Sequence, residues 1–397
     1  MTSDARCPRC GTQLAPGIEA EGLCPRCLLM LALPSATEDA APARPDGPDG
    51  HHPDRIDRIG PYRILETLGE GGMGVVYLAE QTEPIRRRVA IKVIKPGMDT
   101  REVLARFDAE RQALAVMTHP NVARVFDAGA TVSGRPYFVM EYVPGIRITE
   151  YCDMRCLSVR ERLELFAKVC EAIQHAHQKG VIHRDFKPSN VLVFSEDGMA
   201  VPKVIDFGLA KATGLPLTAR TLYTGRGSVM GTPEYMSPEQ AGAKALDVDA
   251  RTDVYSLGVL LYELLAGALP FEPTTLRRAA AVEMLRIIQE EEPPRLSTKF
   301  GALAEAAPEV ARRRHTDVRS LARHLHGELD WITLRAMEKD PDRRYPSASE
   351  LASEVRRHLA DEPVVAGPPS RAYRLKKLVR RNRAAVAAAA ISFGILL

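Results

Sequence analysis

The sequence predicts an α+β fold in which strands come first and helices follow. Two observations support this order. Apolar strands are expected at 62–68, 75–80 and 89–92, and the first two flank a glycine-rich loop. Further along, residues 159–179 carry the periodicity of a long amphipathic helix, and a very apolar helix begins at Asp253.

Composition narrows the class of protein. With 397 residues the chain has room for two or three domains and a large core. Its 45% apolar and 26% charged residues are typical of a soluble globular protein, and a net charge of +3 gives no general case for nucleic-acid binding. Residues 1–10 lack the apolar core of a secretory signal, so we expect a reducing compartment for the seven cysteines.

The stretch His-Arg-Asp-Phe-Lys-Pro-Ser-Asn, residues 183–190, is the most informative in the chain. Asp185 offers a carboxylate that could take a proton from a hydroxyl, and Lys187 could neutralise a nearby phosphate. Asn190 and Asp206, the latter in an Asp-Phe-Gly triplet, offer oxygen atoms to a hard cation such as Mg²⁺. Transfer of a phosphoryl group needs positioning and charge neutralisation, which these residue types supply.

A glycine-rich loop precedes a strand that ends in lysine. Gly69, Gly71 and Gly74 fit the pattern Gly-x-Gly-x-x-Gly, in which glycines let the backbone approach phosphates. A dinucleotide-binding turn shares this pattern, but there a helix follows, whereas here a second strand follows. The expected nucleotide-binding residues of this loop are Leu68, Gly69, Glu70, Gly71, Gly72, Met73, Gly74 and Val76.

These motifs, in this order, resemble those of a protein kinase, and the resemblance covers about residues 62–359. It implies a two-lobed fold with a β-rich N-lobe and a helical C-lobe. It also implies ATP and Mg²⁺ as cofactors, with Mn²⁺ as an alternative metal, and Asp185 and Lys187 as catalytic residues. By this resemblance Asn190 and Asp206 hold Mg²⁺.

The resemblance assigns further nucleotide contacts. Lys92 is expected to hold the α- and β-phosphates and to pair with Glu110, for which Glu102 is a less well placed competitor. Met140 corresponds to the gatekeeper, and the backbone of Glu141 and Val143 is expected to bind adenine. Pro144 to Arg147 lacks the acid that often binds ribose, so the ribose contact stays open.

Regulation is expected in the segment 206–239. Thr221 and Thr224 are the first candidates for autophosphorylation and Ser228 the third, and the alternative is that they are ordinary hydroxyl residues of a polar loop. The resemblance implies that Arg184 pairs with a phosphorylated residue there. The Gly-Thr ending at Thr232, with Lys187, indicates Ser or Thr on protein substrates as the acceptor, and a homodimer is a possible route to autophosphorylation.

Other residues are expected to support the site. Asp253 resembles the buried aspartate that braces the catalytic loop, and Arg344 is expected to pair with Glu239. Residues 272–329 carry a run of three Glu at 290–292 and one of three Arg at 312–314. These runs suit solvated faces better than an insertion or a docking surface.

The N-terminal segment, residues 1–33, predicts a zinc ribbon. Cys7, Cys10, Cys24 and Cys27 form two identical Cys-Pro-Arg-Cys knuckles that can close a tetrahedron around structural Zn²⁺, in preference to a redox pair or incidental cysteines. Residues 34–58, rich in Pro, Ala, Asp and Gly, are expected to be a disordered linker.

The C-terminal part predicts a membrane association. Residues 370–383 hold seven basic side chains and no acidic one, and residues 384–397 are uncharged and mostly apolar. A short or truncated membrane anchor with the kinase domain on the cytoplasmic side is favoured over an amphipathic or core-docking tail, with a cytoplasmic protein as the alternative. The whole layout is similar to bacterial receptor-like Ser/Thr kinases.

The expected function is therefore ATP-dependent phosphorylation of Ser or Thr on proteins, in signal transduction. A pseudokinase is disfavoured by the intact Lys92, Asp185, Asn190 and Asp206. A small-molecule phosphotransferase is disfavoured by the full glycine loop and by the Ser-Pro-Glu sequence at 237–239. A DNA-binding role for the zinc segment is disfavoured because that segment lacks a dense basic face.

Overall fold

The computed structural model describes residues 57–71, 74–95, 117–207, 232–242, 248–368 and 370–381. The chain divides into two compact units. The first comprises residues up to 100 together with 125–146, and the second comprises 101–124 and 147 onward. Each unit is described by itself.

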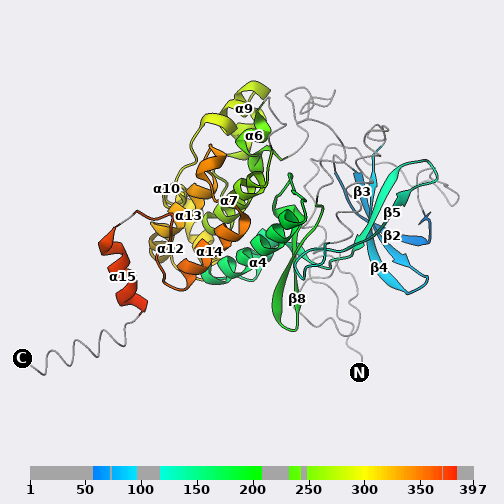
Figure 1. Cartoon of the computed structure of the whole chain (residues 1–397), viewed down its shortest axis with the longest axis horizontal. Helices are drawn as coiled ribbons and strands as arrows, with labels where there is room; N and C mark the ends of the chain where they lie inside the picture. Colours follow the sequence, from blue (N-terminus) through cyan, green and yellow to red (C-terminus); the bar gives the residue numbers. More distant parts are fainter. Residues whose placement is uncertain are drawn as a thin grey trace, which may run out of the picture. The chain divides into compact units, whose positions relative to one another are not determined.

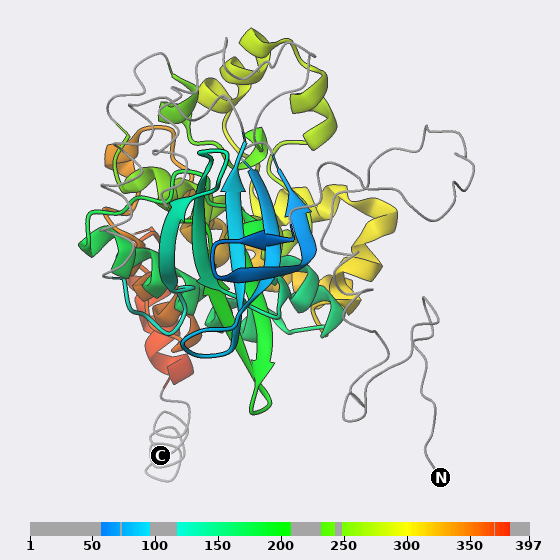
Figure 2. The same ribbon diagram turned by 90° about the vertical axis from the view of Figure 1, so that its right-hand side faces the viewer.

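The first unit is an antiparallel sheet (blue and cyan in Figure 1 and Figure 2). Its strand order is β1-β2-β3-β4-β6-β5. The strands are β1 (Arg58–Ile59), β2 (Tyr62–Glu70), β3 (Gly74–Gln81), β4 (Arg87–Ile94), β5 (Val125–Ala130) and β6 (Pro136–Glu141). Strand β5 begins at Val125, and Val122 upstream of it forms an isolated bridge with Val204 in the second unit.

Alternation along the strands gives this sheet two different faces. One face carries a core cluster that includes Val89, Ile91 and Val93 of β4 with Tyr137 and Val139 of β6. Directly opposite residues in an antiparallel pair share a face, and successive residues alternate. The residues between these core positions, Lys92 among them, therefore lie on the other face.

The glycine loop is pinned to its neighbour strand at Gly74. A Cβ atom added there would lie 2.3 Å from the carbonyl oxygen of Val93, whereas one added at Gly71 would meet nothing within 4 Å. Close packing against β4 thus requires glycine at position 74, in addition to the approach to phosphates inferred from the sequence. Gly71 has open space, as close approach by a ligand requires.

The second unit opens with a short strand, a helix and a hairpin. Strand β7 (Ile146–Arg147), at the boundary of the two units, leads into α3 (Ile148–Met154). Strands β8 (Val191–Glu196) and β9 (Met199–Val204) pair in antiparallel fashion. Their two-residue turn has Asp197 and Gly198 at positive φ, 50° and 77°, which is the conformation that Asp-Gly favours in such turns.

Helices make up the rest of the second unit (green to red in Figure 1). Helix α4 packs against α7 and α14, and α7 also packs against α13. The helices are α4 (Val159–Gln178), α6 (Pro238–Ala241), α7 (Arg251–Ala266), α8 (Pro273–Arg278), α9 (Ala281–Glu290), α10 (Leu296–Ala302), α11 (Ala307–Arg312), α12 (Val318–Leu325), α13 (Glu328–Ala336), α14 (Ala348–Leu359) and α15 (Arg371–Arg381), with 3-10 turns η1 (Pro188–Asn190), η2 (Pro233–Tyr235), η4 (Ala304–Ala306) and η5 (Pro341–Arg343).

Sequence signals explain the ends of the two central helices. Ser158 caps α4, and Glu161 reaches back to complete a capping box. Helix α7 ends at Gly267, whose φ of 71° is the left-handed conformation that glycine adopts at low cost. Gly258 lets α13 come close, because a Cβ there would lie 2.8 Å from the side chain of Ala336. Helix α7 is therefore buried on almost every side.

Two buried arginines bind the last carbonyls of α7. Arg314, 1% exposed, donates to the carbonyl oxygens of Leu265 and Leu264 at 2.6 and 2.9 Å. Arg162, also 1% exposed, donates to Leu264 at 3.1 Å. The expectation that the arginine run is a solvated face is thus wrong for Arg314, because the free carbonyls of a buried helix end need donors. The Glu run at 290–292 is exposed as expected.

Within the parts of the chain that the structure describes, no helix is both long and apolar enough to span a bilayer.

We predict that Gly74→Ala forces β3 away from β4 and lowers the free energy of unfolding by about 1–3 kcal/mol. Gly71→Ala is the matched control, because its added methyl group has open space. It should keep the wild-type melting temperature and instead raise the KM for ATP. Thermal unfolding and ATP titration measure both effects. Equal melting temperatures for the two variants would contradict the packing role of Gly74.

Candidate active site

The expected catalytic residues come together in one loop of the second unit. Lys187 Nζ lies 2.8 Å from Asp185 Oδ2, so the cation and the carboxylate form one ion pair. Asn190 ends the 3-10 turn η1, and its Nδ2 donates to the backbone oxygen of Asp185 at 2.8 Å. This bond fixes the amide so that its oxygen, Oδ1, which accepts a 3.4 Å hydrogen bond from Ser189 Oγ, is the atom that can also face a metal.

Asp253 braces this loop, as the sequence predicts. It is fully buried on α7, and its Oδ2 accepts the backbone N–H of His183 at 2.8 Å. Its Oδ1 accepts the backbone N–H of Arg184 at 2.9 Å, and His177 Nε2 of α4 lies 2.7 Å from Oδ2. One carboxylate therefore holds the loop to two helices.

The charge of Asp253 is maintained inside the protein. Burial by itself raises the pKa of this carboxyl group, but the hydrogen bond from His177 and the backbone N–H of His183 outweigh it, and the net pKa is lowered. Asp253 therefore stays ionised at neutral pH, as an acceptor of three hydrogen bonds must.

Two residues of the site have strained backbones. Arg184 and Asp206 have φ of 65° and 62°, a region that non-glycine residues seldom adopt. Arg184 is held on both sides, because its N–H donates to Asp253 and its carbonyl oxygen accepts from Gln240 Nε2 at 2.5 Å. These two backbone conformations set the direction of the chain just before Asp185 and at Asp206, the expected metal ligand.

His183 connects the catalytic loop to the expected metal-binding loop. Its ring lies 5.4 Å from the ring of Phe186 and 5.0 Å from that of Phe207. Its Nε2 lies 3.1 Å from the carbonyl oxygen of Ile205, the residue before Asp206. Phe186, 1% exposed, packs inward. The position of Asp206 therefore depends on the same histidine that begins the catalytic loop.

The segment that begins at Thr232 is anchored by the predicted ion pair. Arg344 is buried and donates from Nη1 and Nη2 to the two carboxylate oxygens of Glu239, each at 2.7 Å. Thr252 Oγ1 adds a third bond to Glu239 at 2.7 Å. Ser237 is fully buried and caps α6. The bidentate ion pair between Arg344 and Glu239 fixes the C-terminal end of the segment.

A buried acid of α7 contacts the same segment at Tyr235. The hydroxyl group of Tyr235 donates to Glu263 Oε2 of α7. Burial raises the pKa of Glu263 to about 6, even though the hydrogen bond from Tyr235 acts in the opposite direction. Burial likewise raises the pKa of Tyr235 well above its usual range. The Glu263 carboxyl group therefore titrates on the acid side of neutral pH, whereas Tyr235 stays protonated there.

In the first unit, the expected nucleotide residues form one row across the sheet. Gly69 of β2 is opposite Val76 of β3, Val76 is opposite Lys92 of β4, and Lys92 is opposite Phe138 of β6. They share the face that lies away from the core cluster. Lys92 is 8% exposed. An ammonium group and a valine side chain on one face can contact a phosphate group and the base of a nucleotide.

The remaining expected residues are placed as follows. Leu68, Glu70 and Gly71 are at the end of β2, Glu141 ends β6, and Val143 is buried just beyond it. The expected site residues outside the described part of the chain are Gly72, Met73, Glu110, Thr221, Thr224, Ser228, Cys7, Cys10, Cys24 and Cys27. In the described residues, no group of three or more His, Cys, Asp or Glu side chains could hold a metal.

Sequence reasoning missed two supporting residues. The first is His177, which bonds to Asp253. Gln240, which holds the carbonyl of Arg184, was not singled out at all. His177 precedes the catalytic loop on an amphipathic helix, and this position is the only signal that could have found it.

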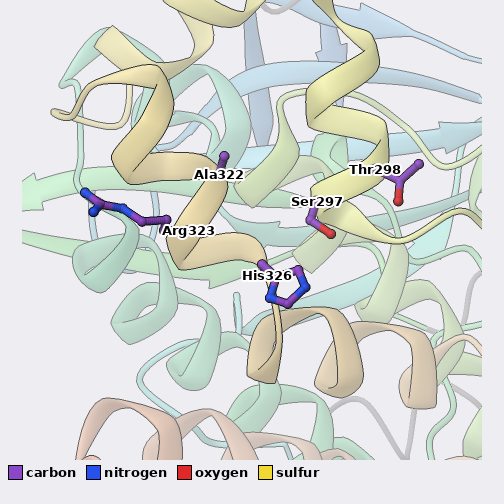
Figure 3. A pocket seen from close by; sticks show the side chains of 5 residues that line it. All are labelled: Ser297, Thr298, Ala322, Arg323 and His326. Carbon is purple, nitrogen blue, oxygen red and sulfur yellow. The ribbon is translucent and has the colours of Figure 1, made fainter.

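A surface hollow elsewhere in the second unit is not part of this site. Its lining residues come from α10, α12 and the residue after α12, and they are Ser297, Thr298, Ala322, Arg323 and His326 (Figure 3). Ser297 is engaged with Asp330 through two bonds of 3.0 and 2.8 Å, and Arg323 donates to Ser320. None of the expected catalytic residues lines it.

The fold and the loop define a class of protein. A model of the protein kinase domain matches residues 62–354. The chain belongs to the protein kinase family.

Several curated bacterial proteins are similar to this chain. The serine/threonine-protein kinase Pkn1 of Myxococcus xanthus is 35% identical over 306 residues, which is 77% of this chain and 39% of that protein. PknB of Mycolicibacterium smegmatis is 36% identical over 308 residues, 76% of this chain and 44% of that protein. The chain thus matches less than half the length of these relatives.

Solved structures agree. The kinase domain of Mycobacterium tuberculosis PknI is 28% identical, with a TM-score of 0.53, and the match covers 76% of this chain and 98% of that one. The predicted two-lobed kinase fold and the serine/threonine-protein-kinase class of the domain are confirmed. Neither the family model nor these relatives bear on the N-terminal zinc ribbon.

We predict that Asp253→Asn destabilises the catalytic loop. Asp253 accepts from three donors, and the amide N–H₂ group of Asn would face one of them without forming a hydrogen bond. The free energy of unfolding should fall by about 1–3 kcal/mol and kcat by about tenfold, with the KM for ATP little changed. Asp249→Asn is the control: its carboxylate is 49% exposed and pairs with Arg251, so its effect should stay below about 1 kcal/mol. Chemical denaturation and steady-state kinetics measure these effects, and similar behaviour of the two variants would exclude the bracing role.

We also predict a pH effect of Glu263. Its pKa is raised from 4.5 to about 6 in the folded protein, so its share of stability is complete below pH 4.5 and is lost as pH rises through about 6. Glu263→Gln imitates the protonated form and should keep that share, about 2 kcal/mol. Unfolding free energies of both proteins between pH 4 and 7 measure the difference. Parallel profiles would show an ordinary pKa for Glu263.

Proposed function

We propose that the whole protein is an ATP-dependent serine/threonine kinase that transfers the γ-phosphoryl group of ATP to Ser or Thr of other proteins. The observation that carries this proposal is the catalytic loop, in which Asp185, Lys187 and Asn190 are joined by direct contacts and braced by the buried Asp253. A module that only binds partners has no need for this arrangement.

The chemistry follows from the residues. Asp185 orients the acceptor hydroxyl and takes its proton, while Lys187, now paired with Asp185, can move toward the charge that develops on the transferred group. Lys92 would hold the α- and β-phosphates, and Glu110 would pair with it. The glycine loop, Leu68 to Gly74 with Val76, would cover the nucleotide, and the backbone of Glu141 and Val143 would bind adenine.

Asn190 and Asp206 fit a magnesium site, because each supplies an oxygen atom, and the amide of Asn190 is turned so that Oδ1 is not the atom bonded to Asp185. When bound, Mg²⁺, or Mn²⁺ in its place, would neutralise charge on the phosphates.

Activation is proposed to involve phosphorylation of the segment that follows Asp206. Arg184 Nε is buried and has no hydrogen-bond partner within the described ranges, which supports a role in binding a phosphate group. We propose Thr221 and Thr224 as the first acceptors and Ser228 as the third, with a homodimer as the arrangement in which one copy phosphorylates another. Thr232 would help to place the substrate hydroxyl.

Two further assignments rest on sequence alone. We propose that the four N-terminal cysteines hold a structural Zn²⁺ ion. We also propose that the predicted linker ends before Asp57, at residues 34–56, because Arg58 already belongs to strand β1. We also propose that residues 384–397 associate with a membrane, with the kinase domain on the cytoplasmic side. The uncharged apolar composition of 384–397 and the seven basic residues at 371–383 support the second assignment.

We predict that the wild-type chain, incubated with ATP and Mg²⁺, acquires phosphate on Thr221 or Thr224, as detected by mass spectrometry. Asp185→Asn should acquire none, because it lacks the base, and its thermal stability should match that of the wild type. A generic protein acceptor tests transfer to substrates in the same samples. Phosphate on neither the chain nor the acceptor would contradict the proposed activity.

A further inference from the structure

Helix α15 is fastened to the helical unit along one side. Tyr373 and Lys377 are four residues apart and so lie on the same face. The Tyr373 ring stands edge-on to Trp331 at 5.8 Å. Its hydroxyl group donates to Glu328 at 3.1 Å and accepts the backbone N–H of Val364 at 3.0 Å. This side of the helix is therefore used for docking.

Ion pairs reinforce the docking. Lys377 is 5% exposed, and its Nζ lies 2.8 Å from Glu328 and 3.5 Å from Asp361. Arg381, one turn further, pairs with Glu362 at 3.4 Å. Burial raises the pKa of Glu328, but the hydrogen bonds from His358 and Lys377 outweigh this and lower it overall. Glu328 is therefore ionised where Lys377 meets it.

The connection into α15 is short and held in place. The backbone N–H groups of Val365 and Ala366 donate to the buried carboxylate of Glu354 at 2.9 and 2.8 Å. Gly367 lies against the ring of Trp331, where a Cβ would come within 3.1 Å. Figure 1 shows α15 (red) at the edge of the helical unit, after α14. Helix α15 is thus a fixed part of the kinase domain's surface.

The opposite side of α15 is apolar and exposed. Leu375, Leu378 and Val379 are 60%, 49% and 41% exposed. At about 100° per residue, Leu375 and Val379 lie nearly opposite Lys377 on the helix. Arg371 and Arg374 are also exposed. An apolar stripe accompanied by cations and backed by a docked face is unusual for a surface that only meets water.

Charge identifies the occupant of this stripe. The segment 371–383 contains seven basic residues and no acidic one, and the uncharged apolar residues 384–397 follow directly. Helices with an apolar stripe and a cationic flank bind in the interface of anionic bilayers, where basic residues near the surface strengthen the attachment. An anionic lipid surface offers acyl chains to the apolar stripe and to residues 384–397, and negative headgroups to the basic side chains.

We infer that α15 lies on an anionic phospholipid surface, with Leu375, Leu378 and Val379 at the boundary of headgroups and acyl chains, while Tyr373 and Lys377 hold the kinase domain to it. This inference rests on the proposed membrane association of residues 384–397. It goes further because it makes the helical unit, and not only the tail, contact the bilayer.

The test uses the full chain with phosphatidylcholine vesicles that contain or lack phosphatidylglycerol. Flotation measures association, and hydrogen exchange measures the protection of amides 375–379. On vesicles with phosphatidylglycerol, these amides should exchange about tenfold more slowly than in buffer. The variant Leu375→Gln/Leu378→Gln/Val379→Gln should lose this protection.

The matched control is Met199→Gln/Val282→Gln/Val318→Gln, which replaces three exposed apolar residues outside α15. It should behave like the wild type in both measurements. Because all six positions are exposed, both variants should keep the wild-type melting temperature and the wild-type rate of phosphorylation.

Three results would overturn the inference, and they differ in what else they affect. Flotation without protection of 375–379 would leave membrane association to the tail and exclude α15. Absence of flotation would exclude both the association and the inference. Protection that depends on protein concentration and not on lipid would identify a second copy of this chain as the occupant. Phosphoryl transfer is measured separately, so its failure is distinguishable from all three.

Discussion

The hydrogen bonds of Asp253 are the constraint on which the catalytic part of the structure depends. A fully buried carboxylate needs several hydrogen-bond donors around it. For Asp253 these donors are two backbone N–H groups and His177. Removing any one donor would leave part of a buried charge uncompensated. The backbone of the catalytic loop is thus fixed by electrostatics in the interior, before any ligand binds.

This constraint also explains how strain is retained at the site. Arg184 and Asp206 occupy a backbone region that costs of order 1–3 kcal/mol per residue. Arg184 is held in it by Asp253 and Gln240, and Asp206 follows Ile205, whose carbonyl oxygen is close to His183. The bracing helix α7 is itself rigid because buried arginines bind its final carbonyls and Gly258 allows α13 to pack closely. The order of the site therefore rests on the helical core behind it.

Local sequence predicts much of this arrangement, and its limits have physical reasons. Motifs with short spacing or distinctive chemistry predict the strand bounds near Tyr62 and Lys92 and the helix at 159–178. They also predict the roles of Asp253, Glu239 and Arg344. His177 and Gln240 belong to no such motif, and only the packing of the helices brings them to Asp253 and to the carbonyl oxygen of Arg184. Arg314 shows the opposite case: its neighbours Arg312 and Arg313 are exposed, and only the packing of α7 determines that it is buried.

The contact between Trp331 and Tyr373 has a spectroscopic consequence. Trp331 is the only tryptophan of the 397 residues, so the indole emission of the whole protein comes from one place. That place is the junction where Gly367 and Tyr373 cover its ring. The emission maximum and its quenching by an aqueous quencher therefore report whether the last described helix is seated or detached, without any added label. Few chains offer a native optical probe at the point where a catalytic domain joins its C-terminal segment.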